Sequence, residues 1–185
     1  MLEKIPRVIG DMLRYARAGQ MKIAYFQAGL DEAPESLTIT SSDFQDGGRL
    51  LAPFTADGEG KSPSLSWSGA PAGTAEAVLI VEDPDAPTPD PLVHAIAWSL
   101  PAEGSLEAGA ISTDEVQTGK NAYMRCDYLP PDPPTGHGPH RYEFQFFALS
   151  APLALSGTPG RKAVLKAMEG KVTAKGRITG IYERV

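Results

Sequence analysis

Seventeen prolines and nineteen glycines punctuate this chain of 185 residues, and after Gly29 they divide it into short apolar runs. Because proline has no backbone N–H to donate, it interrupts helices and the inner strands of sheets. Short apolar runs bounded by such residues are typical of an all-β sandwich or barrel. We therefore predict a mostly β domain over residues 29–185.

The predicted strands are the runs in which apolar residues alternate or follow one another without a break. They cover residues 37–40, 65–67, 77–81, 94–100 and 142–149, with a last strand through Ile178, Gly180 and Tyr182. The run 77–81 is apolar throughout, which indicates a strand buried on both faces. Residues 161–168 have helical spacing and precede Gly170, so a short helix should come before the last strand.

Residues 1–28 form a separate region, predicted to be an N-terminal helix with a lead-in to the β domain. Its apolar residues recur at helical spacing, with Pro6 tolerable in the first turn: Ile5, Val8, Ile9, Met12, Leu13 and Ala16. Charged residues interrupt this segment too often for a signal peptide or a membrane span. We expect an amphipathic helix packed on its own domain, with a homodimer contact or a membrane surface as alternatives.

Size and charge exclude several classes of protein. The length suits one domain, and 42% hydrophobic residues are enough for a core. A net charge of -6 without a basic cluster argues against nucleic acid as a partner. The single cysteine, Cys126, cannot form an intramolecular disulfide and fits a reducing compartment, so we expect a cytoplasmic protein.

All three histidines, His94, His137 and His140, lie beside two Pro-rich segments, residues 83–91 and 130–139. Asp83 and Asp85 open the first of these segments directly after the buried strand 77–81. Carboxylates at a strand end, held by prolines, are placed to reach a pocket. The alternative is an Asx turn that only ends the strand.

The second Pro-rich segment leads into His140, and Tyr142 follows two residues later on the same strand face. Two imidazoles near a carboxylate should be stabilised in their protonated forms, which would supply N–H donors for phosphate or carboxylate oxygens near neutral pH. A small hydrolase with His140 as general base beside Asp83 is one alternative. A zinc site made of the same histidines and carboxylate is another.

These motifs together resemble the phosphatidylethanolamine-binding proteins, which include the Raf kinase inhibitor proteins and a large bacterial branch. The resemblance rests on the sequence Asp-Pro-Asp-Ala-Pro from residue 83, on His94 leading its strand, and on the segment from Pro133 to the sequence His-Arg-Tyr at residue 140. It implies a Greek-key β-sandwich with a pocket between the two Pro-rich loops. The pocket residues that it implies are Asp83, Asp85, His94, His140 and Tyr142, with Pro87 and Pro134 shaping the walls.

The resemblance also implies a function without catalysis or a cofactor. The expected ligand is a small phosphate-like or carboxylate anion or a phospholipid headgroup, and the expected partner is a kinase or protease that the protein modulates. Arg141 resembles the family arginine that ties the loops to an acidic residue. Asp132 departs from the Gly or Cys that many members carry before the Pro-Pro pair. A carboxylate at this edge would weaken binding of a dianionic phosphate and favour a cationic or zwitterionic ligand.

Overall fold

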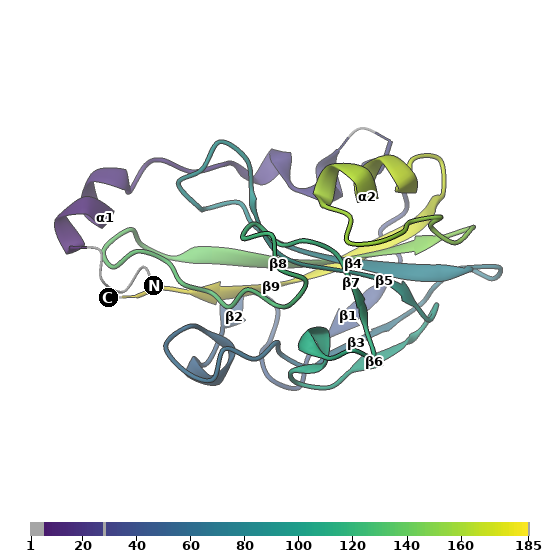
Figure 1. Cartoon of the computed structure of the whole chain (residues 1–185), viewed down its shortest axis with the longest axis horizontal. Coiled ribbons are helices and arrows are strands. Elements are labelled where there is room, and N and C mark those ends of the chain that lie inside the picture. The colour runs from purple at the N-terminus through teal and green to yellow at the C-terminus, as the bar shows by residue number, and fades with distance from the viewer. Residues whose placement is uncertain (1–5, 28, 185) are drawn as a thin grey trace.

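The computed structural model describes residues 6–27 and 29–184, and its main elements are two β-sheets (Figure 1). The smaller sheet has the order β1-β3-β6 and the larger one the order β2-β9-β8-β4-β5-β7. The strands are β1 (Thr38–Thr40), β2 (Gly48–Arg49), β3 (Leu65–Ser68), β4 (Glu76–Asp83), β5 (Leu92–Leu100), β6 (Gly104–Leu106), β7 (Gln117–Thr118), β8 (His140–Leu149) and β9 (Val172–Tyr182). Strands β2 and β9 are parallel and the other pairs antiparallel, so the larger sheet is mixed.

The helix at residues 161–168 and the 3₁₀ turns at residues 20–26 cover the other face of the larger sheet, which therefore lies between a helical layer and the smaller sheet (Figure 1). The two α-helices are α1 (Arg7–Leu13) and α2 (Arg161–Met168). Short 3₁₀ turns complete the described elements: η2 (Gln20–Lys22), η3 (Ala24–Phe26), η4 (Ala52–Phe54) and η5 (Ala110–Ser112).

Strand β4 is buried along its whole length, as its unbroken apolar run predicted. Leu79 and Val81 join a hydrophobic cluster that also contains Trp67 of the smaller sheet. Val78 and Ile80 point the other way, into a cluster with residues of α2 and η3. Two cores on opposite faces hold this strand, and its end at Asp83 is therefore a fixed position from which to build a site.

Each predicted strand and the helix 161–168 are present, although several strands are longer than predicted. The largest difference is β9, which begins at Val172, whereas only its end was predicted. Lys175 and Gly176 concealed its start, because a charged residue and a glycine are unusual inside a buried strand. A Cβ on Gly176 would lie 2.3 Å from the Leu37 carbonyl oxygen, so only glycine fits there. The Greek-key connection stays a prediction.

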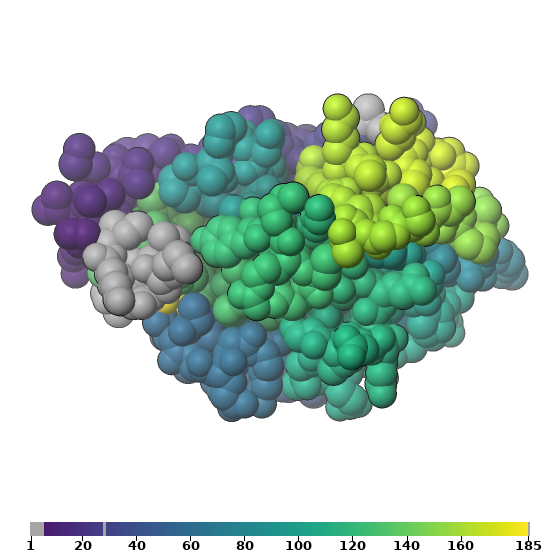
Figure 2. Space-filling model, in the orientation of Figure 1, coloured from purple at the N-terminus to yellow at the C-terminus, as the bar shows by residue number. Residues whose placement is uncertain are grey.

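The N-terminal helix is shorter than predicted and does not bury its apolar face. Helix α1 ends at Leu13, while Val8 and Met12 are 67% and 80% exposed. Gly10 is the buried residue of the helix, and α1 projects at one end of the molecule (Figure 2). The helix does pack on its own domain, through Gly10 against Thr135 and through Leu13 at the pocket, but most of its apolar residues are exposed instead of buried. The part of the predicted helix up to Ile5 lies outside them.

The lead-in after α1 belongs to the packed structure. Ile23, Ala24 and Tyr25 are buried in the cluster beneath α2, so the packing continues across the boundary predicted at residue 28. Lys175 secures this segment, because its Nζ donates to the carbonyl oxygens of Tyr25 at 3.0 Å and Asp31 at 2.8 Å. Among the described helices, none has the length and apolar character needed to cross a bilayer.

Candidate functional site

A β-bulge brings His94 to the site. Along β4 and β5 the register passes from Val81 opposite Ala95 to Glu82 opposite Val93, so His94 is the extra residue between these pairs. A bulge of this kind bends the strand and redirects a side chain. The His94 ring meets Tyr142 of β8 edge to face, with 5.0 Å between ring centroids.

The protonation of His94 follows from its contact with Leu129. Nδ1 lies 2.6 Å from the Leu129 carbonyl oxygen, which can only accept a hydrogen bond, so Nδ1 carries the proton. Burial lowers the pKa of His94, even though Asp83 and the Leu129 carbonyl act in the opposite direction. The direction of this shift favours a neutral ring near pH 7 over the protonated His94 that was expected, because desolvation outweighs the nearby carboxylate.

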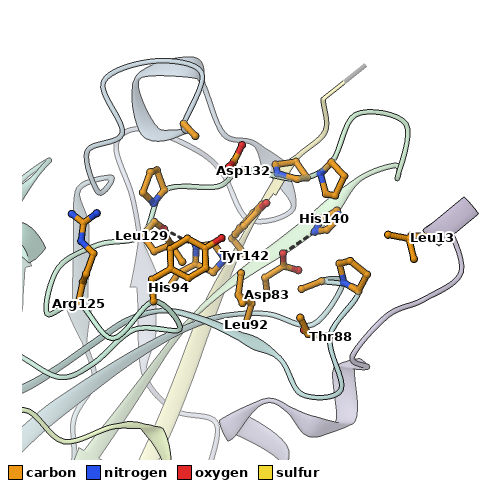
Figure 3. Close-up of a pocket in the computed structure, with 17 residues that line it drawn as sticks. Leu13, Asp83, Thr88, Leu92, His94, Arg125, Leu129, Asp132, His140 and Tyr142 are labelled. Carbon is orange, nitrogen blue, oxygen red and sulfur yellow. Dashed lines mark hydrogen bonds and ion pairs between the residues drawn. The ribbon is translucent and has the colours of Figure 1, made fainter. Parts of the chain in front are cut away.

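Asp83 uses both carboxylate oxygens (Figure 3). Oδ1 accepts the backbone N–H of Asp85 at 2.7 Å, which is the Asx turn considered as the alternative role. Oδ2 lies 2.7 Å from Nδ1 of His140. The turn and the pocket contact are thus two functions of one side chain.

His140 is held from both sides. Its Nδ1 donates to Asp83, and its Nε2 lies 2.7 Å from Nδ1 of His137. At this second contact one of the two ring nitrogens donates a hydrogen bond and the other accepts it. Burial lowers the pKa of His137. The result is a buried chain from Asp83 through His140 to His137, in which neither nitrogen of His140 is free to donate to a ligand.

Asp85 does not line the pocket, so that part of the predicted site was wrong. Its oxygens accept from Nε and Nη2 of Arg141, both at 2.8 Å, and from the Arg141 backbone N–H. Arg17 adds a contact at 2.8 Å. Burial alone would raise the pKa of the Asp85 carboxyl, but the hydrogen bonds from the two arginines lower it to about 2. Asp85 is therefore the acidic residue that binds Arg141, the arginine expected to hold the loops.

The remaining predicted residues surround a pocket of about 440 Å³ (Figure 3). Asp83, His94, His140 and Tyr142 bring the polar atoms, and Pro87, Asp132 and Pro134 belong to the walls. Asp132 is ion-paired with Arg184 at 2.7 Å. Both Pro-rich loops contribute to this lining, one through residues 86–88 and the other through Pro130, Asp132, Pro133 and Pro134.

Sequence reasoning missed ten of the residues that line the pocket. These residues are Leu13, Ala56, Ala86, Thr88, Leu92, Tyr123, Arg125, Leu129, Pro130 and Pro133. Four of them lie within the Pro-rich loops: Ala86, Thr88, Pro130 and Pro133. The position of these residues in the loops was therefore a sequence signal that they line the pocket. Leu13 comes from α1, and Tyr123 and Arg125 come from the turn after β7. Nothing in the local sequence of those segments indicates a pocket.

The zinc alternative lacks a ligand set within residues 6–27 and 29–184. No three His, Cys, Asp or Glu side chains in that part of the chain are grouped so that they could hold one ion. Asp83 and His140 already bind each other, and His94 Nδ1 is occupied by Leu129.

Comparisons with known proteins identify the family. The family model described as phosphatidylethanolamine-binding protein matches residues 40–183. A UPF0098 protein of Pyrococcus horikoshii is 33% identical over 100% of this chain and 95% of its own length. A UPF0098 protein of Aquifex aeolicus is 36% identical over 80% of this chain and 89% of its own length.

Solved structures agree. A phosphatidylethanolamine-binding protein homologue of Chlamydia trachomatis superposes with a TM-score of 0.75 and 31% identity, covering 82% of this chain and 99% of its own. YbcL of Escherichia coli, described as a member of the mammalian family, gives a TM-score of 0.75 with 27% identity over 81% and 99% of the two chains. The chain therefore belongs to the phosphatidylethanolamine-binding protein family.

Proposed function

We propose that this protein binds a small amphiphilic molecule in the pocket and does not transform it. The observation that carries the proposal is the contrast between a polar end, made by Asp83, His94 and His140, and walls made mainly of proline and leucine. Small-molecule sites commonly combine an apolar lining with a few placed polar groups, in volumes of roughly 300–1,000 Å³. The ligand classes that the family suggests are phosphate-like or carboxylate compounds and phospholipid headgroups.

The hydrolase alternative has little support from the site. A His-carboxylate pair can activate a hydroxyl, a thiol or a water molecule, but the free imidazole nitrogen must face that nucleophile. In His140 the nitrogen that would act as base faces His137 instead. The Thr88 hydroxyl, which belongs to the pocket wall, donates to the Asp90 carbonyl oxygen at 2.7 Å. Cys126 is exposed and is not among the pocket residues.

A regulatory role is the second part of the proposal. In this proposal the protein binds a kinase or a protease and changes its activity. A ligand bound in the pocket then alters the size of that change. Assays of kinase or protease activity with and without the protein measure the change in partner activity. Repeating each assay with a pocket ligand measures how the ligand alters that change.

The binding proposal is tested by titration with dihexanoyl phosphatidylethanolamine below its micellar concentration, followed by NMR. Shifts should concentrate on the residues around the pocket. Thr88→Trp should weaken binding at least about tenfold, because the indole fills the space that the ligand needs. Thr113→Trp is the matched control, since Thr113 is exposed and its hydroxyl also donates to a nearby carbonyl oxygen. Equal affinity in both variants, or shifts elsewhere, would refute the pocket as the site.

A further inference from the structure

The outer face of α1 carries large apolar side chains that the domain does not bury. Val8, Ile9 and Met12 are 67%, 43% and 80% exposed, and Tyr15, in the turn that follows the helix, is 92% exposed. We call these four side chains the α1 apolar stripe. They are half of the eight large apolar side chains that are exposed among the described residues. Single exposed apolar side chains are common, but a cluster of them on one short segment marks an interaction surface.

The attachment of α1 turns this stripe away from the domain. Gly10 packs on the Thr135 carbonyl oxygen, which would lie 2.0 Å from a Cβ at residue 10. Val8 and Met12 are each two residues from Gly10, which places them about 200° from it around an α-helix. They therefore face outward from a helix that projects at one end of the molecule (Figure 2).

The charge of this segment is opposite to that of the rest of the chain. Residues 6–22 hold four of the seventeen Lys and Arg residues and one of the twenty-three Asp and Glu residues, so their net charge is +3 and that of the rest is -9. Arg7 and Arg17 are ion-paired, whereas Arg14 is exposed and has no ion pair within the described part of the chain. An exposed apolar stripe beside an unpaired arginine complements a surface that is apolar beneath and anionic above.

A second copy of this chain fits the stripe less well. Helix α1 has seven residues and is about 10 Å long, so one face of it covers on the order of 100–200 Å². A stable protein–protein interface buries about 800 Å² on each partner. Two chains that each have a net charge of -6 also repel each other. A bilayer has no such requirement, since apolar side chains insert singly between its headgroups.

We propose that α1 docks this protein on an anionic membrane surface. The α1 apolar stripe inserts between the lipid headgroups, and Arg14 binds lipid phosphates. This inference goes beyond the proposed function, because the attachment does not use the pocket and does not depend on what the pocket binds.

Vesicle sedimentation with the full chain tests the docking. Vesicles of phosphatidylcholine with about 30% phosphatidylglycerol supply the anionic surface, and phosphatidylcholine alone is the neutral comparison. We expect partition onto the anionic vesicles to be at least about fivefold stronger. Sodium chloride at about 0.5 M should remove most of this difference, because salt screens exposed charges.

Two exposed positions identify the surface that binds. Met12→Glu should weaken partition about tenfold, because a carboxylate replaces an inserted apolar side chain. Met21→Glu is the matched control: Met21 is 69% exposed and belongs to the same basic segment but not to the stripe, so partition should stay within about twofold of wild type.

Arg14→Gln should weaken partition onto anionic vesicles about fivefold, as expected for the loss of one cation near anionic lipid. Lys166→Gln is its control, because Lys166 is an exposed cation of α2, which lies away from α1 along the molecule (Figure 1). Lys166→Gln should partition like wild type.

Thr88→Trp separates docking through α1 from docking through the pocket. This variant should still bind the vesicles, because the indole fills the pocket and leaves the stripe exposed. Vesicle binding that is lost in Thr88→Trp but kept in Met12→Glu would overturn this inference and leave the proposed function standing.

Three further outcomes would overturn the docking proposal. Two of them are equal partition onto neutral and anionic vesicles, and no partition onto either. The third is a wild-type dimer in sedimentation velocity that Met12→Glu converts to a monomer, which would assign the stripe to a second copy of the chain.

Discussion

Gly10 of α1 packs so closely on Thr135 that a Cβ at residue 10 would lie 2.0 Å from the Thr135 carbonyl oxygen. This contact joins the N-terminal helix to the second Pro-rich loop. Leu13 of the same helix lines the pocket, so the helix that the family model does not cover forms part of the candidate site.

Gly10→Ala should therefore displace α1 from the loop, despite the higher helix propensity of alanine. We expect a loss of about 1–3 kcal/mol in unfolding free energy, typical of forced overpacking, and faster amide exchange in α1. Urea denaturation and hydrogen exchange measure these changes. Met12→Ala is the control because Met12 is 80% exposed, and it should leave both unchanged. A Gly10→Ala protein as stable as wild type would show that the helix does not hold this position.

The Asp85–Arg141 ion pair predicts the behaviour of the protein in acid. The pKa of Asp85 is lowered to about 2, below its value in an unfolded chain, so the stabilisation is present above about pH 4 and disappears as pH falls toward 2. With about 1.4 kcal/mol per pKa unit, the contribution is on the order of 2 kcal/mol. Asp85→Asn should lose it at neutral pH and show a flatter decline of stability below pH 4.

Urea midpoints between pH 3 and pH 7 test this prediction. Asp90→Asn is the matched control, since Asp90 is an exposed carboxylate of the same loop. Parallel pH curves for wild type and Asp85→Asn would contradict the assigned role of the pair.

The buried histidines predict a second pH effect, in a different range. Burial lowers the pKa of both His94 and His137, while the unfolded chain takes up these protons near pH 6.5. The groups that face them are Asp83 and His140 around His94, and His140 and Arg17 around His137. Because the unfolded state then binds more protons, stability should be complete above about pH 6.5 and fall as pH decreases below it.

Between pH 7 and pH 5 the loss should reach at most about 2 kcal/mol for each histidine. His94→Gln and His137→Gln should each reduce the slope of stability against pH. Stability that stays constant or increases as the pH falls from 7 to 5 would mean that the rings are protonated in the folded protein.

The absence of enzymatic turnover is a further prediction, motivated by the engagement of His140 Nε2 with His137. Purified protein should not accelerate hydrolysis of p-nitrophenyl acetate or p-nitrophenyl phosphate beyond the rate of a His140→Ala variant. A rate that copurifies with the protein and disappears in that variant would restore the hydrolase alternative.

The sequence was a good guide where local pattern decides structure. The apolar run in β4 predicted a doubly buried strand, and the Pro-rich segments predicted the two loops beside the pocket. Predictions from the sequence were wrong where contacts between distant segments determine the environment of a side chain. Neither the shielding of His94 by burial nor the engagement of Asp85 by Arg17, 68 positions earlier, is encoded in a local pattern.

The N-terminal helix shows the same limit of local pattern. Its apolar spacing predicted a packed stripe, but packing on the loop selected Gly10, the residue without a side chain, and left Val8 and Met12 exposed. Periodicity identifies a helix and its faces, while the partner surface determines which face is buried.

The most direct test of the central claim, a buried and neutral His94 whose Nδ1 donates to the Leu129 carbonyl oxygen, is ¹⁵N NMR of the histidine side chains at pH 7. Long-range ¹H–¹⁵N spectra distinguish a protonated from an unprotonated ring nitrogen, and His94→Gln assigns the signals. We predict that His94 carries its proton on Nδ1 and that its Nε2 is unprotonated. A proton on Nε2 of His94 at pH 7 would contradict the claim.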